Sequence, residues 1–119
     1  MSIVDKKVNG HQLHCQNPWF SLIREGKKPV EGRKNLPKYN DWKVGDSLRF
    51  VLGDDYFDTR IVAMRRYTTL EDYLNTETLA RTLPGIKTLE EGVKIYMQWS
   101  SPKDIERFGF LAIEIALKK

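Results

Sequence analysis

The centre of the chain reads as a β-hairpin, which constrains the fold more than any other feature of the sequence. Val44-Gly45-Asp46 is a turn signal, residues 47–52 form a partly alternating strand, and Gly53-Asp54-Asp55 is the next turn signal. Residues 56–67 then read as a long returning strand. Two consecutive strands that are joined by so short a turn form an antiparallel pair. The sequence therefore predicts a mainly antiparallel sheet.

The residues before the hairpin predict one strand, one helix and one extended segment. Residues 11–16 alternate over a short stretch, as in a first strand. Asn17 before a proline fits a helix N-cap with proline in the first turn, and Gly26 fits a helix stop. Residues 28–34 then read as extended, and Pro29 places this segment at a sheet edge or a strand start.

The residues after the hairpin predict helices and a closing strand. Thr69 fits the N-cap of a short helix, residues 78–83 form a helical turn, and a capping box at residues 88–91 opens a helix to about Trp99. Residues 108–117 read as an apolar central strand. Because regular strand–helix–strand alternation is absent from the pattern, we expect an α+β fold with a curved sheet and flanking helices.

Length and composition indicate an ordinary globular chain. A length of 119 residues predicts a single domain over 1–119, with residues 1–9 as a flexible N-terminal tail. Apolar runs fall well short of the roughly 20 residues that span a bilayer, and the N-terminus lacks the apolar stretch of a signal peptide. The lone Cys15 predicts a reducing, intracellular location, cytoplasmic or, in a eukaryote, nuclear.

The charge is distributed unevenly. Seven cations and three carboxylates lie between Arg24 and Lys43, so this window carries the whole formal net charge of +4. A basic patch beside aromatic residues favours an anionic partner such as RNA or a nucleotide, while a solvated basic face explains the charge equally well. We expect no metal and no cofactor, because His11, His14 and Cys15 have no second cluster to complete a zinc site.

Residues 26–33 are the densest part of this window. Glu31 and Arg33 lie two apart, so an extended strand presents them on one face, and a bend at Pro29 or a bulge is needed to bring Lys28 to the same place. One interpretation is a pocket in which Arg33 offers a planar fork to phosphate or a base edge. The other is a structural Glu31–Arg33 ion pair that ties the helix to the sheet.

Three motifs in order are similar to those of a known family. Asn17-Pro18-Trp19, then Gly26-x-Lys28-x-x-Glu31-x-Arg33, then Val44-Gly45-Asp46-x-Leu48-x-Phe50 resemble the ASCH domain family (activating signal cointegrator homology). The resemblance covers nearly the whole chain and implies a PUA-like β-barrel. It also implies an RNA- or nucleotide-binding module, with a role in RNA metabolism or regulation, whose basic cleft lies between the first helix and the barrel.

The resemblance puts Lys28, Glu31 and Arg33 at the centre of that cleft. Trp19 then stacks on a base or, alternatively, packs in the core. The remaining candidates are cations that contact backbone phosphates or lie on a solvated surface: Arg24, Lys27 and Lys34.

A second function follows from one bacterial branch that resembles the family and hydrolyses acylated cytidine with a lysine, a threonine and a downstream glutamate. Lys28 occupies the lysine position, but Glu31 stands where the threonine is expected. Glu77, Glu90 and Glu91 are the nearest candidates for the glutamate. The alternative is therefore a small hydrolase of modified nucleosides or of RNA, with Lys28 as base or nucleophile and Glu31 as proton shuttle.

Overall fold

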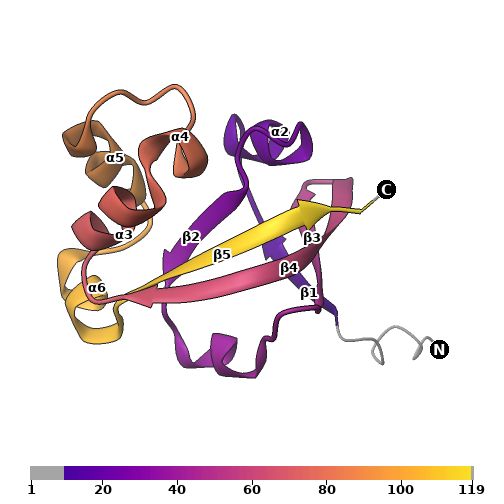
Figure 1. Ribbon diagram of the computed structural model, residues 1–119, viewed down its shortest axis with the longest axis horizontal. Coiled ribbons are helices and arrows are strands. Elements are labelled where there is room, and N and C mark those ends of the chain that lie inside the picture. The colour runs from indigo at the N-terminus through magenta and orange to yellow at the C-terminus, as the bar shows by residue number, and fades with distance from the viewer. Residues whose placement is uncertain (1–9, 119) are drawn as a thin grey trace.

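A single curled sheet organises the part of the chain that the structure, a computed structural model, describes, namely residues 10–118 (Figure 1). Its five strands lie in the order β1-β3-β4-β5-β2. The strands are β1 (Gly10–His14), β2 (Val30–Lys34), β3 (Ser47–Leu52), β4 (Asp55–Tyr67) and β5 (Phe110–Leu117). The helices are α2 (Trp19–Arg24), the short 3-10 helix η1 (Pro37–Asp41), α3 (Leu70–Glu77), α4 (Leu79–Thr82), α5 (Leu89–Tyr96) and α6 (Pro102–Phe108).

The strand pairings confirm the mainly antiparallel, curved sheet. β3 and β4 form the expected hairpin, β4 pairs with β5 and β5 with β2, all antiparallel, whereas β1 joins β3 in parallel. The β4–β5 register shifts between Ile61 and Ala63, and such irregularities bend a strand and increase its twist. β1 and β2 are therefore the two edges of a sheet that curls like part of a barrel.

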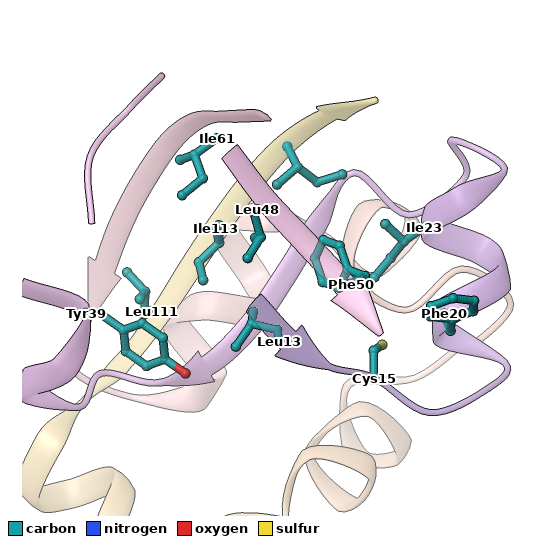
Figure 2. Packing of buried hydrophobic residues seen from close by; sticks show 11 residues of the cluster. Leu13, Cys15, Phe20, Ile23, Tyr39, Leu48, Phe50, Ile61, Leu111 and Ile113 are labelled. Atoms are coloured by element: carbon teal, nitrogen blue, oxygen red, sulfur yellow. The ribbon is translucent and has the colours of Figure 1, made fainter. Parts of the chain in front are cut away.

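Two apolar cores cover the two faces of the sheet. Inside the curl, side chains from β1, β3, β4 and β5 meet Phe20 and Ile23 of α2 (Figure 2). On the other face, α3, α5 and α6 bury residues that include Tyr73, Tyr96 and Ile105. The interior strand β5 supplies both cores, because its side chains alternate between the two faces and five of its eight residues are buried.

Two of the helix starts predicted from the sequence are confirmed. The Thr69 hydroxyl accepts a hydrogen bond from the Asp72 amide at 3.0 Å, and the Thr88 hydroxyl accepts one from the Glu91 amide at 3.1 Å. Each bond satisfies an amide that has no partner within the first turn of its helix.

The end of the predicted long helix is wrong. α5 ends at Tyr96 rather than Trp99, and a separate helix, α6, lies between α5 and the closing strand. Ser101 caps α6 by accepting from the Asp104 amide, with a proline at the first helical position. Gly109, at a φ of 79°, ends α6, so the closing strand begins two residues later than predicted.

Among residues 10–118, none of the helices has the length and apolar character needed to cross a membrane. The predicted tail at residues 1–9 lies outside the described part of the chain.

Candidate functional site

A cavity of about 520 Å³ opens between the two edge strands of the sheet. The end of β1 and the start of α2 form one wall, and β2 forms another. The residues at the start of η1, the end of α5 with the segment after it, and the end of β3 with the following turn also contribute to the lining. The side chains that matter for its chemistry are Cys15, Trp19, Lys28, Glu31, Arg33, Lys34, Lys38, Tyr39, Tyr96, Trp99 and Ser100.

Arg33 bridges the gap between the two sheet edges. Its Nη2 donates to the backbone carbonyl of His14 at 2.8 Å, and its Nε donates to the Glu31 carboxylate at 2.8 Å. Burial raises the pKa of the Tyr39 hydroxyl, while attraction to Arg33 and a hydrogen bond with it oppose that shift, so Tyr39 also faces this guanidinium in the cavity lining.

Glu31 lies between two cations in a buried position. Its Oε1 is 3.2 Å from Lys28 Nζ and its Oε2 is 2.8 Å from Arg33 Nη2. Burial alone would raise the pKa of the Glu31 carboxyl, but attraction to Lys28 and Arg33 and their hydrogen bonds outweigh burial and lower that pKa. The Glu31–Arg33 ion pair considered from the sequence is therefore present, within a three-residue cluster.

Lys28 is the unusual member of this cluster, because its side chain is only 1% exposed. Its Nζ donates to the carbonyls of Val30, at 2.9 Å, and of Thr82, and lies beside Glu31. Burial lowers the pKa of the Lys28 ammonium, while Glu31 opposes that shift. The three contacts match the three donors of an ammonium group, so Lys28 is fully engaged within the protein.

The backbone explains how Lys28 reaches Glu31. Gly26, at a φ of 82°, turns the chain after α2, and the amides of Lys27 and Lys28 both donate to the Leu22 carbonyl. Lys28 thus lies before β2 begins at Val30 and is not bound by strand alternation. The turn therefore lies at Gly26 and Lys27, shortly before Pro29, where the sequence predicted the bend.

Aromatic rings supply much of the remaining lining. Trp19 is half-buried and contacts both apolar cores, while Lys28 Nζ lies 5.8 Å from the centre of its ring. Tyr39 and Tyr96 are buried, and Trp99 is 47% exposed. Sequence reasoning did not identify Tyr39, Tyr96, Trp99 or the rim residue Lys38. The one local signal for Trp99 was its place at the end of the helix predicted after residue 88.

The cavity does not include every cation that the sequence suggested. Arg24 donates two hydrogen bonds to Asp55 and packs over the rings of Phe20 and Phe57, so it lies away from the cavity lining. Lys27 is exposed, with its Nζ 3.4 Å from Glu25. Lys34 does line the cavity, and its Nζ is 3.3 Å from Asp104.

None of the candidate downstream glutamates reaches the cavity in the described part of the chain. Glu77 is buried on the opposite side of the sheet, where Arg65 donates to it at 2.6 and 2.7 Å and the Tyr67 hydroxyl also donates. Glu90 and Glu91 occupy the exposed first turn of α5.

Cys15 lines the cavity but is buried, and burial raises the pKa of its thiol to about 12. A thiol with so high a pKa is almost wholly protonated near neutral pH, which disfavours a nucleophilic role. Within residues 10–118, no group of three or more His, Cys, Asp or Glu side chains is placed to hold a metal ion.

Comparison with known proteins supports the fold. The family model described as ASCH domain matches residues 13–119. The structure of hypothetical protein PH0355 superposes with a TM-score of 0.85 at 32% sequence identity, covering 92% of this chain and 99% of that one. Protein PF0455 from Pyrococcus furiosus, solved by NMR, gives a TM-score of 0.76 at 31% identity, covering 92% of this chain and 98% of that one.

A more distant likeness extends only to the fold. The ASCH protein from Zymomonas mobilis gives a TM-score of 0.60 at 12% identity, with 91% of this chain and 68% of that one covered. A search of curated proteins found no match.

Proposed function

Because the chain belongs to the ASCH domain family, which is associated with RNA binding, we propose that the cavity binds a nucleotide of single-stranded RNA. The observation that carries the proposal is the lining itself. A cavity of about 520 Å³ combines four cations, a single carboxylate and several aromatic rings at the gap between β1 and β2. That combination matches the charge and the flat rings of a nucleotide.

The cations differ in what they offer a ligand. Lys28 is fully engaged by protein groups, whereas the Arg33 side chain is 27% exposed and lines the cavity beside Tyr39. Lys38 is exposed at the rim, with its Nζ 5.3 Å from the centre of the Tyr39 ring. We therefore expect Arg33 to bind a phosphate or base oxygen inside the cavity and Lys38 to contact a backbone phosphate at its mouth.

Stacking adds a second source of affinity. Trp99 presents an exposed ring at the cavity, so it can cover one face of a base without any rearrangement of the core. Base–aromatic stacking contributes roughly 1–3 kcal/mol per base. Trp19 contacts both cores, which favours a supporting role for its ring.

The test is a binding titration with short single-stranded RNA and nucleoside 5′-monophosphates, followed by tryptophan fluorescence. Lys38→Ala and Arg33→Ala are expected to weaken binding, and affinity is expected to fall steeply as salt is added. Arg49→Ala is the matched control, because Arg49 pairs with Asp58 on the β3–β4 hairpin outside the cavity. Equal effects of Lys38→Ala and Arg49→Ala, or no binding at low salt, would contradict the proposal.

The contacts of Lys28 do not favour the alternative hydrolase. A catalytic lysine base or nucleophile needs an amino group that can reach the substrate, but two carbonyls and Glu31 occupy the Lys28 amino group inside the protein. Glu31 is likewise held by Lys28 and Arg33. Release of cytidine from acylated cytidine by the wild-type protein, abolished by Lys28→Met, would instead support hydrolysis.

A further inference from the structure

The outer edge of β2 faces the cavity, and its pairing with β5 shows which backbone groups point there. The Asn35 amide donates to the Gly109 carbonyl at 3.0 Å, and the Ile115 amide donates to the Pro29 carbonyl at 3.0 Å. Antiparallel pairing alternates, so odd-numbered residues of this segment bond to β5 and even-numbered residues direct their amide and carbonyl to the opposite side. No strand pairs with that side, because β2 is an edge of the sheet.

Both ends of this edge are closed by the protein itself. Lys28 Nζ donates to the Val30 carbonyl at 2.9 Å, and the Leu36 amide donates to the Lys34 carbonyl at 2.8 Å. Between them remain the amide of Gly32, the carbonyl of Gly32 and the amide of Lys34, in that order. None of the three has a hydrogen-bond partner among residues 10–118. Both Gly32 and Lys34 line the cavity.

The packing of the second core explains the glycine at position 32. Gly32 is buried, yet a Cβ at this position would lie 2.4 Å from Tyr73 Oη and 2.7 Å from Phe110 Cε2, so the packing of the second core excludes a side chain. Buried backbone amides and carbonyls are almost always paired, since leaving them unpaired costs free energy. As on any edge strand these three adjacent groups are left open, and here they face a cavity in which a ligand can reach them.

We propose that this open edge of β2, the amide and carbonyl of Gly32 with the amide of Lys34, recognises the imide face of a uracil-type base. The edge presents donor, acceptor and donor. Uracil presents acceptor, donor and acceptor through O4, N3–H and O2. The distance between O4 and O2 of uracil is shorter than the roughly 6.8 Å between the amides of residues two apart on a strand. The hydrogen bonds from the Gly32 and Lys34 amides therefore lean inward toward the base.

The other bases do not complement this order of groups. Cytosine presents a donor and two acceptors, guanine an acceptor and two donors, and adenine an amino donor beside one ring acceptor. Each would leave at least one edge group unpaired or set like groups against each other, which is costly in a buried site. An extended peptide is also a poor match, because Lys28 and Leu36 close the edge after a single residue pair.

This inference rests on the RNA-binding function proposed above, and its test varies the ligand because Gly32→Ala would disturb the core. Uridine 5′-monophosphate, its N3-methyl analogue and the monophosphates of cytidine, adenosine and guanosine are titrated against the wild-type protein. Uridine 5′-monophosphate should bind about tenfold or more tightly than the N3-methyl analogue, which lacks the donor that pairs with the Gly32 carbonyl.

Amide hydrogen exchange supplies the second readout. Saturating uridine 5′-monophosphate should slow exchange of the Gly32 and Lys34 amides, whereas the Glu31 and Arg33 amides, already paired with β5, serve as controls and should change little. Equal affinity for the N3-methyl analogue, tighter binding of another base, or unchanged exchange at Gly32 would overturn the uracil assignment while leaving nucleotide binding intact. Failure of every nucleotide and RNA to bind would overturn the proposed function as well.

Discussion

Replacing Lys28 with methionine removes the buried ammonium while keeping a long, flexible, apolar side chain of similar shape. The variant leaves the carbonyls of Val30 and Thr82 without their donor and leaves Glu31 with Arg33 as its one remaining cation. Because the Lys28 side chain is 1% exposed, water cannot easily replace these contacts. The prediction is a large loss of stability.

The size of the loss follows from what is left behind. Removing one partner of a buried ion pair typically costs about 3–5 kcal/mol. Arg33 still compensates part of the Glu31 charge, which moves the expected value to the lower end of that range, about 3 kcal/mol. The measurement is urea unfolding at pH 7, with the loss seen as a lower midpoint at an unchanged slope.

A double-mutant cycle separates the energy of the Lys28–Glu31 ion pair from the cost of changing the two side-chain shapes. Glu31→Gln alone leaves Lys28 and Arg33 as unbalanced cations, whereas Lys28→Met combined with Glu31→Gln removes both charges of one pair. The double variant is expected to lose clearly less than the sum of the single losses, with a coupling of about 1–3 kcal/mol. Additive losses, or a cost below about 1 kcal/mol for Lys28→Met, would refute the view that these charges stabilise one another.

Three further predictions concern stability and reactivity. Hydrogen bonds from Arg65 hold the pKa of the Glu77 carboxyl below its ordinary value of 4.5, so Glu77 contributes stability above pH 4.5 that is lost as pH falls through the lower folded-state pKa. The urea midpoint should therefore fall less steeply with decreasing pH in Glu77→Gln than in the wild type, and an unchanged pH dependence would contradict this. Gly32→Ala should cost about 1–3 kcal/mol in thermal unfolding, because its Cβ would lie within 2.7 Å of Tyr73 and Phe110; a neutral result would mean that the rings move aside freely. Cys15, with a thiol pKa of about 12, should react slowly with an aromatic disulfide reagent at pH 8 and rapidly once urea unfolds the chain, and a fast native reaction would show that the thiol is accessible.

The fold was largely predictable from local patterns. The hairpin of β3 and β4, the threonine caps at Thr69 and Thr88 and the apolar β5 each depend on residues near one another in the chain. α6 was missed because its residues are mixed in polarity, and its start depends on one serine cap before a proline. Helix boundaries of this kind depend on the residues of a single turn, and the periodicity of apolar residues does not locate them.

The candidate site was predictable only in part. Glu31 and Arg33 share a face because strand alternation places them there, and the motif that contains them identified both as candidate site residues. Lys38, Tyr39, Tyr96 and Trp99 join them from segments 5 to 66 residues beyond Arg33 in the sequence. Their position in the cavity depends on the curl of the sheet and on where the helices after β4 pack. Neither can be read from a short stretch of the sequence.

The sequence by itself determined the family, the order of the strands and of most helices, and the shared strand face of Glu31 and Arg33, because these depend on motif spacing and backbone periodicity. The tertiary structure alone decided that Lys28 is buried and saturated by the carbonyls of Val30 and Thr82. It also decided that Arg24 pairs with Asp55 away from the cavity. The physical reason is the same for both cations: the environment of a charge is set by the segments that pack around it, which lie far away in the chain.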